Sequence, residues 1–176
     1  MVKYCYIYWV YSGFGGYMHQ ITFTLRNNED VDMALARLKK SPFYKDDTVV
    51  YAELSDNDRD RIKLSEIIRR IKEVVKNVRI AGFTSVAGIN KGETITSGIV
   101  VTFMIFESSE VSVFCYDGTC YAEEEIAKLL MRDLERKKGV CMRLFVNAFY
   151  MKHPEGFFNN FTLKSTELQV TGTIAT

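Results

Sequence analysis

The side chains best suited to binding chemistry are the basic residues between positions 59 and 79. This segment holds eight Lys and Arg against three Asp and Glu, and its apolar residues recur at helical spacing. At 100° per residue, Arg69, Lys72 and Lys76 fall on one outward face of the predicted helix. A cationic row of this kind can bind phosphate groups or an acidic protein surface. The candidate binding residues of the segment are Arg69, Arg70, Lys72 and Lys76.

The same basic face has a second interpretation that requires no partner. Oppositely charged residues three or four positions apart on a helix can pair, here Glu66 with Arg70 and Glu73 with Lys76. The row would then be an ordinary solvated helix face. Both interpretations stay open at the level of sequence.

A second group of candidate binding residues lies in the β-prone segment from Tyr4 to Tyr11. Tyr4, Tyr6 and Tyr8 alternate with apolar residues, and a strand places such alternate positions on one face. If that face were exposed, the rings could stack on the bases of a single-stranded nucleic acid or dominate a protein interface. If a helix covers it, the three tyrosines belong to the core.

Motifs for cofactor or metal binding are incomplete in this chain. The glycine-rich turn at 12–16 joins two predicted strands and lacks the Lys-Ser/Thr pair of a phosphate-binding loop. The run from Asp56 to Asp60 begins like a calcium loop, but the sixth position is Arg61 and the twelfth is Ile67. Cys115 and Cys120 flank a tight turn without the second ligand pair of a zinc site. We therefore predict no cofactor and no metal.

The two histidines offer the only acid–base candidates near neutral pH. His19 lies on the mainly apolar face of a predicted strand, where a structural histidine is commoner than a catalytic one. His153 stands in a predicted turn beside a proline. A nucleophilic pair such as Cys5 with His19 would need a proximity that spacing does not establish. The sequence thus favours a protein without enzymatic activity and leaves a small enzyme with a pocket around His19 as an alternative.

Composition narrows the class of protein and its partners. The chain has 176 residues, 47% of them hydrophobic, with 23 Lys and Arg against 22 Asp and Glu. These are values of an ordinary globular protein, and no global field attracts nucleic acid or an anionic membrane. No apolar run approaches the roughly 20 residues of a membrane-spanning helix. The four cysteines lie in strand-like, apolar segments without a secretory signal, so we expect reduced thiols, no membrane partner and a cytoplasmic location.

The pattern of the chain predicts an α+β fold with the element order ββαβα-βββαββ. A long hairpin of strands 4–11 and 17–25 would form the nucleus of a mainly antiparallel sheet of about seven or eight strands, with three helices packed on it. The remaining predicted elements are a helix over 31–38, a strand over 48–54, a helix over 64–78, strands over 79–86, 98–106 and 110–116, a helix over 121–138, and strands over 140–151 and 161–174. No sequence repeat is apparent. We expect a single domain over 1–176, with halves 1–78 and 79–176 as the alternative.

These observations predict a protein that binds a macromolecule without catalysis. A protein partner is favoured, because the net charge is only +1 and the basic segment is interspersed with acids. Small domains of this kind are frequent among regulators and inhibitors, including those of phages and mobile elements. The first alternative is a nucleic-acid-binding protein that uses the basic helix of 59–79. A homodimer through an unpaired sheet edge also fits the predicted fold.

Overall fold

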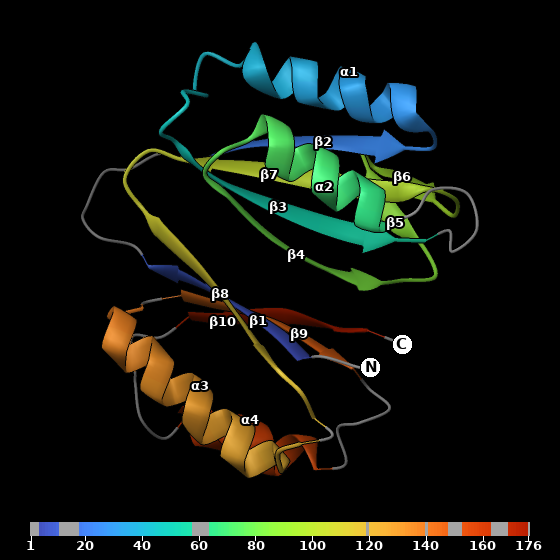
Figure 1. Ribbon diagram of the computed structural model, residues 1–176. Coiled ribbons are helices and arrows are strands. Elements are labelled where there is room, and N and C mark those ends of the chain that lie inside the picture. The colour runs from blue at the N-terminus through green and yellow to red at the C-terminus, as the bar shows by residue number, and fades with distance from the viewer. Residues whose placement is uncertain are drawn as a thin grey trace. The chain divides into compact units, whose positions relative to one another are not determined.

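The computed structural model describes residues 4–10, 18–57, 64–118, 120–139, 141–147, 153–162 and 169–175. Its contacts divide the chain into two compact units (Figure 1). Unit 1 comprises Met1–Ser12 and Glu110–Thr176, and unit 2 comprises Gly13–Ser109. The single domain over 1–176 stays a prediction, and so does the alternative boundary, which falls inside a strand of unit 2.

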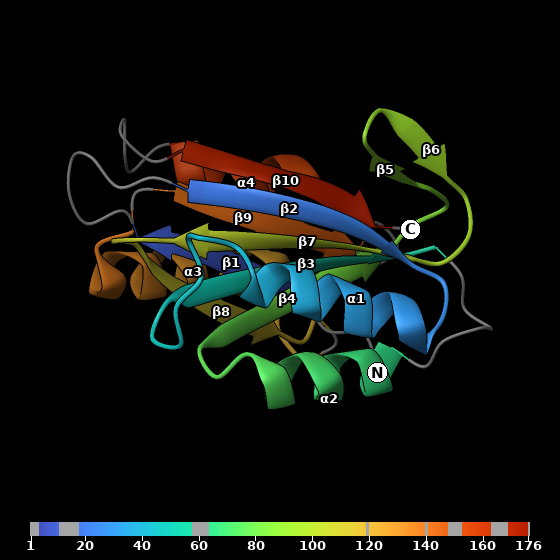
Figure 2. The ribbon, with the colours of Figure 1, turned by 90° about the horizontal axis from the view of Figure 1, so that it is seen from above.

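Unit 2 is a four-stranded sheet with two helices on one of its faces (Figure 1). Its strands lie in the order β2 (Met18–Leu25), β7 (Ile99–Phe106), β3 (Val49–Asp56) and β4 (Val78–Thr84). The pair β3 and β4 is parallel and the other two pairs are antiparallel. The helices are α1 (Asn28–Lys39) and α2 (Leu64–Val74). In the sequence, a small hairpin of β5 (Gly88–Asn90) and β6 (Glu93–Ile95) follows β4 and precedes β7. This hairpin projects beyond the sheet (Figure 2).

The sequence predicts both helices of unit 2, although α2 ends at Val74 rather than at 78. The side chain of Asn27 accepts a hydrogen bond from the Asp30 amide at 2.8 Å and so caps α1. The apolar stripe of α1 includes Val31 and Leu38, both buried against the sheet. In α2 the stripe continues through Ile67 and Ile71, which are buried in the same cluster. Burial of these stripes is the main favourable contribution to the stability of the unit.

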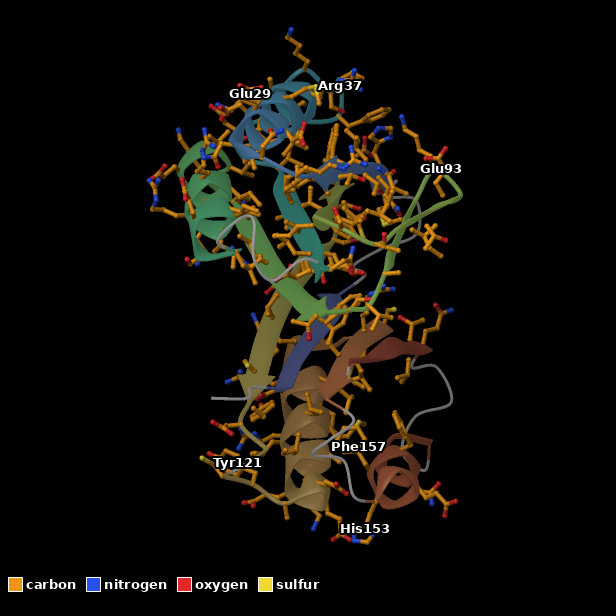
Figure 3. The ribbon with its side chains drawn as sticks, turned by 90° about the vertical axis from the view of Figure 1, so that its right-hand side faces the viewer. Glu29, Arg37, Glu93, Tyr121, His153 and Phe157 are labelled. Carbon is orange, nitrogen blue, oxygen red and sulfur yellow. The ribbon has the colours of Figure 1, made fainter. Side chains whose placement is uncertain are left out.

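Unit 1 is also a four-stranded sheet with two helices. Its strands lie in the order β8 (Glu110–Tyr116), β1 (Tyr4–Val10), β9 (Cys141–Asn147) and β10 (Gln169–Ala175). The pair β9 and β10 is parallel and the other two pairs are antiparallel. The helices are α3 (Glu123–Lys137) and α4 (Pro154–Thr162). Phe157 of α4 is buried in one cluster with α3 residues such as Leu130 and with Leu144 of β9 (Figure 3).

The two units share one topology. In each, a strand, a helix, a strand, a helix and a strand follow one another, and an added strand lies between the first two strands of that series. The series is β2-α1-β3-α2-β4 in unit 2 and β8-α3-β9-α4-β10 in unit 1. The added strand is β7 in unit 2, whereas in unit 1 it is β1 from the start of the chain. Unit 1 is thus completed by a strand that is remote in sequence from its other elements.

Matching residues confirm that the topologies correspond in detail. Leu54 lies opposite Gly82 across β3 and β4, and Leu144 lies opposite Gly172 across β9 and β10. Leu54 and Leu144 are 90 positions apart in the sequence, and so are Gly82 and Gly172. At both glycines an added Cβ would meet the backbone oxygen of the opposite leucine, at 2.3 Å in unit 2 and 2.5 Å in unit 1. Both glycines therefore permit the same close approach of parallel strands.

The predicted α+β class is confirmed, but the single sheet and its hairpin nucleus are wrong. The strands β1 and β2 belong to different sheets, so they do not pair. Strand β1 is an internal strand, since it lies between β8 and β9. The glycine-rich turn at 12–16 lies outside the described residues.

The number of elements was also underestimated. The described part of the chain has ten strands rather than seven or eight, because β5 and β6 lie where a turn was expected, and four helices rather than three, because α4 lies in the carboxyl-terminal third. The predicted turn at His153–Gly156 and the start of the predicted strand at 161 belong to α4. Its aromatic residues resemble those of a strand, but Pro154 suits the first position of a helix. Burial of Phe157 then decides in favour of the helix.

Candidate functional site

A cleft of about 360 Å³ lies at one end of the sheet of unit 2. It forms where the connection between α1 and β3 meets the start of β3 and the end of β7. Its lining residues are Pro42, Phe43, Lys45, Asp47, Thr48, Val49, Phe106, Glu107 and Ser109. The volume lies within the range of pockets that hold small ligands.

The wall of the cleft is a turn-rich connection that the chain holds in place by local hydrogen bonds. Two hydrogen bonds link Lys45 and Thr48. The Thr48 amide donates to the Lys45 carbonyl at 3.0 Å, and the Lys45 amide donates to the Thr48 hydroxyl at 3.1 Å. Asn77 ties the connection to the sheet, because its side-chain amide donates to the Asp47 carbonyl at 3.1 Å. The connection is therefore a defined wall of the cleft, positioned from both sides.

Tyr44 also holds the connection between α1 and β3 in place. Its ring is half-buried against the hydrophobic cluster of unit 2. Burial, and after it the negative charge of Asp46, raises the pKa of the Tyr44 hydroxyl above its ordinary value. Tyr44 therefore stays neutral at physiological pH and acts as an apolar anchor, while its neighbours Phe43 and Lys45 line the cleft.

The cleft combines aromatic surface with charged side chains. Phe106 is buried, whereas Phe43 is 41% exposed and stacks on the His19 ring with 4.3 Å between centroids. Lys45, Asp47 and Glu107 are exposed and make no ion pair within the described part of the chain. Charged side chains that do not pair with one another can pair instead with oppositely charged groups of a ligand.

The basic helix differs from its prediction in its ion pairs. Arg69 pairs with Glu73 at 2.5 Å within α2, and Arg70 pairs with Asp32 of α1 at 2.5 Å. The predicted Glu66–Arg70 and Glu73–Lys76 pairs are wrong, because Arg70 faces the neighbouring helix α1 and α2 ends at Val74. The two arginines are thus partly neutralised.

Lys72 and Lys76 remain as exposed cations with no ion pair among the described residues. They do not share one helix, because Lys76 lies beyond the end of α2. The predicted row of Arg69, Lys72 and Lys76 on one helix face is therefore wrong, because Lys76 lies outside the helix. The binding role of Arg69, Arg70, Lys72 and Lys76 itself stays a prediction.

The tyrosine row of β1 is described by its backbone alone. Tyr6 lies opposite Phe114 of β8 and Leu144 of β9, and Tyr8 lies opposite Ser112 and Met142. Tyr4 lies opposite Tyr116. The proposed binding role of these tyrosines stays a prediction, since their side chains lie outside the described part of the structure.

The histidines have no acid–base partner among the described residues. The His19 ring packs on Phe43, and no hydrogen bond to its imidazole occurs there. The backbone amide of His153, rather than its ring, donates to Glu123 at 2.8 Å. This arrangement lends no support to the alternative of a small enzyme around His19.

The described ranges contain no cluster of metal-binding side chains. No group of three or more His, Cys, Asp or Glu residues there could hold a metal ion. Most of the segment 56–60 lies outside those ranges. Among the described helices, none has both the length and the apolar character required to cross a bilayer.

Unit 1 contains a buried polar cluster that the sequence analysis missed. Asp133 of α3 is only 4% exposed and accepts a hydrogen bond from the Tyr116 hydroxyl of β8. The guanidinium groups of Arg132 and Arg136 lie 3.5 and 3.4 Å from the other carboxylate oxygen. Burial and this hydrogen bond raise the pKa of Tyr116 to about 12. Tyr121 packs edge-on against the Tyr116 ring (Figure 3). The cluster joins α3 to β8 and so has a structural explanation.

The cleft residues were also missed by sequence analysis, although one signal was present. The segment 40–48 carries a proline, two aromatic residues and several charges between a well-defined helix and strand. Such a connection is a common location for binding residues. Glu107 and Ser109 carry no comparable signal, because only the fold brings the end of β7 next to this connection.

Comparison with known protein families gives one match. The family model described as FIST N domain matches residues 49–176 of the chain, from β3 to the carboxyl end. No curated protein and no solved structure matches the sequence.

Proposed function

The chain belongs to the FIST N domain family, a family of sensory domains associated with signal transduction, and on this premise we propose that it is a non-catalytic sensor. Its ligand is a small molecule that binds in the cleft of unit 2. Its output is a change in the binding of a protein partner. The cleft is the observation that carries this proposal, because it is a preformed concave site with converging charged groups.

The chemistry of the lining indicates the class of ligand. Phe43 offers exposed aromatic surface to an apolar portion of the ligand, and the buried Phe106 forms part of the cleft wall. Lys45 can bind an anionic group, and Asp47 and Glu107 can bind a cationic or hydrogen-bond-donating group. We therefore expect a small organic molecule with an apolar part and at least one charged group.

The partner of the sensor is proposed to be a protein, in a cytoplasmic setting. Family membership supports a regulatory role and gives no support to a viral origin or an inhibitory role. Exposed thiols such as those of Cys115 and Cys120 suit a reducing compartment. A homodimer is compatible with this proposal, because β2 and β4 are the outer strands of the unit 2 sheet.

A calorimetric titration of the full chain tests the proposal against its nucleic-acid alternative. The probes are a set of small compounds that pair an apolar group with an anionic, cationic or zwitterionic group, and a single-stranded oligonucleotide. A compound that binds the wild-type chain should bind Lys45→Ala about tenfold more weakly, the loss of one charged contact. Phe43→Ala should weaken it similarly.

Two matched variants serve as controls for that titration. Lys72→Ala removes an exposed lysine of α2, and Met33→Ala removes an exposed apolar side chain of α1. Neither residue lines the cleft, so both should keep the wild-type affinity. If Lys45→Ala and Lys72→Ala lowered the affinity for the compound equally, the cleft would not be the binding site. Salt-dependent binding of the oligonucleotide that Lys72→Ala weakens would favour the nucleic-acid alternative.

A further inference from the structure

Two cysteines that are 110 positions apart in the sequence lie directly opposite each other in the sheet of unit 1. The register of the antiparallel pair β1 and β8 sets Cys5 against Cys115. The neighbouring pairs are Tyr4 with Tyr116 and Tyr6 with Phe114. The match therefore lies inside a continuous ladder that runs from Tyr4 to Val10.

Opposite positions in an antiparallel pair satisfy the backbone requirement of a disulfide. The Cα atoms of such positions are about 4.5 or 5.5 Å apart, depending on whether the two residues exchange hydrogen bonds. Disulfides span Cα separations of about 4.4–6.8 Å. Directly opposite positions also lie on the same face of the sheet. The Cα separation set by the register therefore falls in the range that a cross-strand disulfide requires.

The position of Cys115 makes it accessible to an oxidant. It is exposed and lies on β8, an outer strand of the unit 1 sheet. Cys141 differs, because it is half-buried and burial raises the pKa of its thiol. A less exposed thiol with less thiolate reacts more slowly. Cys115 is therefore better placed than Cys141 to start an exchange reaction.

We propose that Cys5 and Cys115 are a redox-sensitive pair that forms a cross-strand disulfide when a low-molecular-weight disulfide is present. The Cys115 thiolate attacks one sulfur of the small disulfide, forms a mixed disulfide and releases one small thiolate. The Cys5 thiolate then attacks the Cys115 sulfur and releases the second small thiolate. The protein loses two protons and two electrons, and the small disulfide is reduced to two thiols.

The bond would have a specific structural consequence. Strand β1 is the one strand of unit 1 that is separated in sequence from the series β8 to β10. A link from Cys5 to Cys115 would tie β1 covalently to β8 and keep the sheet complete. Oxidation therefore stabilises unit 1 through the strand that completes it, independently of ligand binding in unit 2.

Peptide mapping of the full chain after incubation with oxidised glutathione tests this proposal. Mass spectrometry without reduction should show a peptide pair joined through Cys5 and Cys115. Cys115→Ser should abolish the pair, whereas Cys120→Ser and Cys141→Ser should retain it. Cys120→Ser is the matched control, because Cys120 is exposed and only five residues away.

Three results would overturn the proposal: a bond between Cys115 and Cys120, a mixture of glutathione adducts without a cross-link, or complete resistance to oxidation. A second measurement does not depend on variants. Hydrogen exchange of the β1 amides in the wild-type chain should slow on oxidation and recover on addition of a reductant. Unchanged exchange in β1 of the cross-linked chain would contradict the proposed tether.

Discussion

Unit 2 and unit 1 fold by the same topology, yet they differ in how they use it. Both have a parallel strand pair held close by a glycine, Gly82 in one and Gly172 in the other. Both bury an apolar residue of the second helix, Ile67 or Phe157, at positions that are again 90 apart. The shared features are those that pack helices on a sheet. Features that differ are therefore candidates for function.

One local difference is the connection from the first helix to the second strand. In unit 2 it runs over nine residues between Lys39 and Val49, and in unit 1 over three residues between Lys137 and Cys141. The cleft is lined by the longer connection. The comparison teaches that the extra loop length in unit 2, rather than the common fold, creates the proposed ligand site.

A second difference lies at the end of the first strand. Leu25 ends β2 and is buried in the apolar cluster, whereas Tyr116 ends β8 and donates to the buried Asp133. Unit 1 thus attaches its first helix by a polar contact where unit 2 uses an apolar one. A polar contact of this kind makes the stability of unit 1 sensitive to pH, as described below.

The largest expected effect tests the correspondence of the two helices. Phe157→Ala should destabilise unit 1 by about 3–5 kcal/mol, and Ile67→Ala should destabilise unit 2 by about 2–5 kcal/mol, because each leaves a cavity at a fully buried site. Hydrogen exchange resolved by segment would show which strands lose protection. If either substitution left the free energy of unfolding unchanged, the two helix positions would not have equivalent roles.

The paired glycines provide the next test. Gly82→Ala and Gly172→Ala each place a Cβ against a backbone oxygen of the neighbouring strand, so each should cost about 1–3 kcal/mol. Gly92→Ala serves as a comparison in open space, although its φ of 81° adds strain of its own. Gly156, which has open space and an ordinary φ, is the cleaner control. Equal stability of Gly82→Ala and Gly156→Ala would show that the close approach is not required.

The polar attachment of unit 1 predicts a smaller, pH-dependent effect. Tyr116→Phe removes the hydroxyl donor of the buried Asp133 carboxylate and should cost about 1–3 kcal/mol near neutral pH. The folded-state pKa of Tyr116 is raised from 10.0 to about 12. Its contribution to stability is therefore complete below pH 10 and is lost as the pH rises through 12.

Chemical denaturation at several pH values checks this prediction. The wild-type chain should lose stability between pH 10 and 12 relative to Tyr116→Phe, so that the two curves converge. A constant difference between them over that range would contradict the assignment.

The smallest expected effects concern the ion pairs of α2. Arg70→Ala breaks a bridge between α1 and α2 and should cost at most about 1 kcal/mol, since Asp32 is largely exposed. Arg69→Ala breaks a pair within one helix and should cost about 0.3–0.5 kcal/mol. Thermal unfolding at low and high salt would measure both. Both substitutions lie in unit 2, and unit 1 has no equivalent bridge between α3 and α4 among the described residues. The two substitutions should therefore lower the stability of unit 2 and leave that of unit 1 unchanged.

Local patterns predicted most elements of the fold but not their assembly. The apolar stripes of α1, α2 and α3 and the alternation in β2 are properties of short segments, and these elements form where expected. The pairing of β1 with β8 and β9 is set by contacts more than 100 residues apart, which no local pattern encodes. The sequence also did not reveal the shared topology of the two units. Buried positions of helices and strands require only an apolar side chain, so equivalent positions can hold different residues, as Ile67 and Phe157 do.

The candidate site was less predictable than the fold for the same reason. The charges of α2 were visible in the sequence, but the partner of Arg70 is Asp32 on another helix. The cleft joins residues near position 45 with Phe106 and Glu107, which meet only because β3 and β7 are neighbours with Val49 opposite Phe106. The turn-rich composition of residues 40–48 was a signal that the prediction did not use, and only the sheet order brings this loop next to the end of β7.

A chemical-shift titration of the uniformly ¹⁵N-labelled full chain with a bound small compound is the most direct test of the cleft as the ligand site. We predict that the perturbed amides lie in segments 42–49 and 106–109, with little change in the short connection between Lys137 and Cys141 of unit 1. Perturbations confined to the exposed face of α2, or spread equally over the matching connections of both units, would contradict the account.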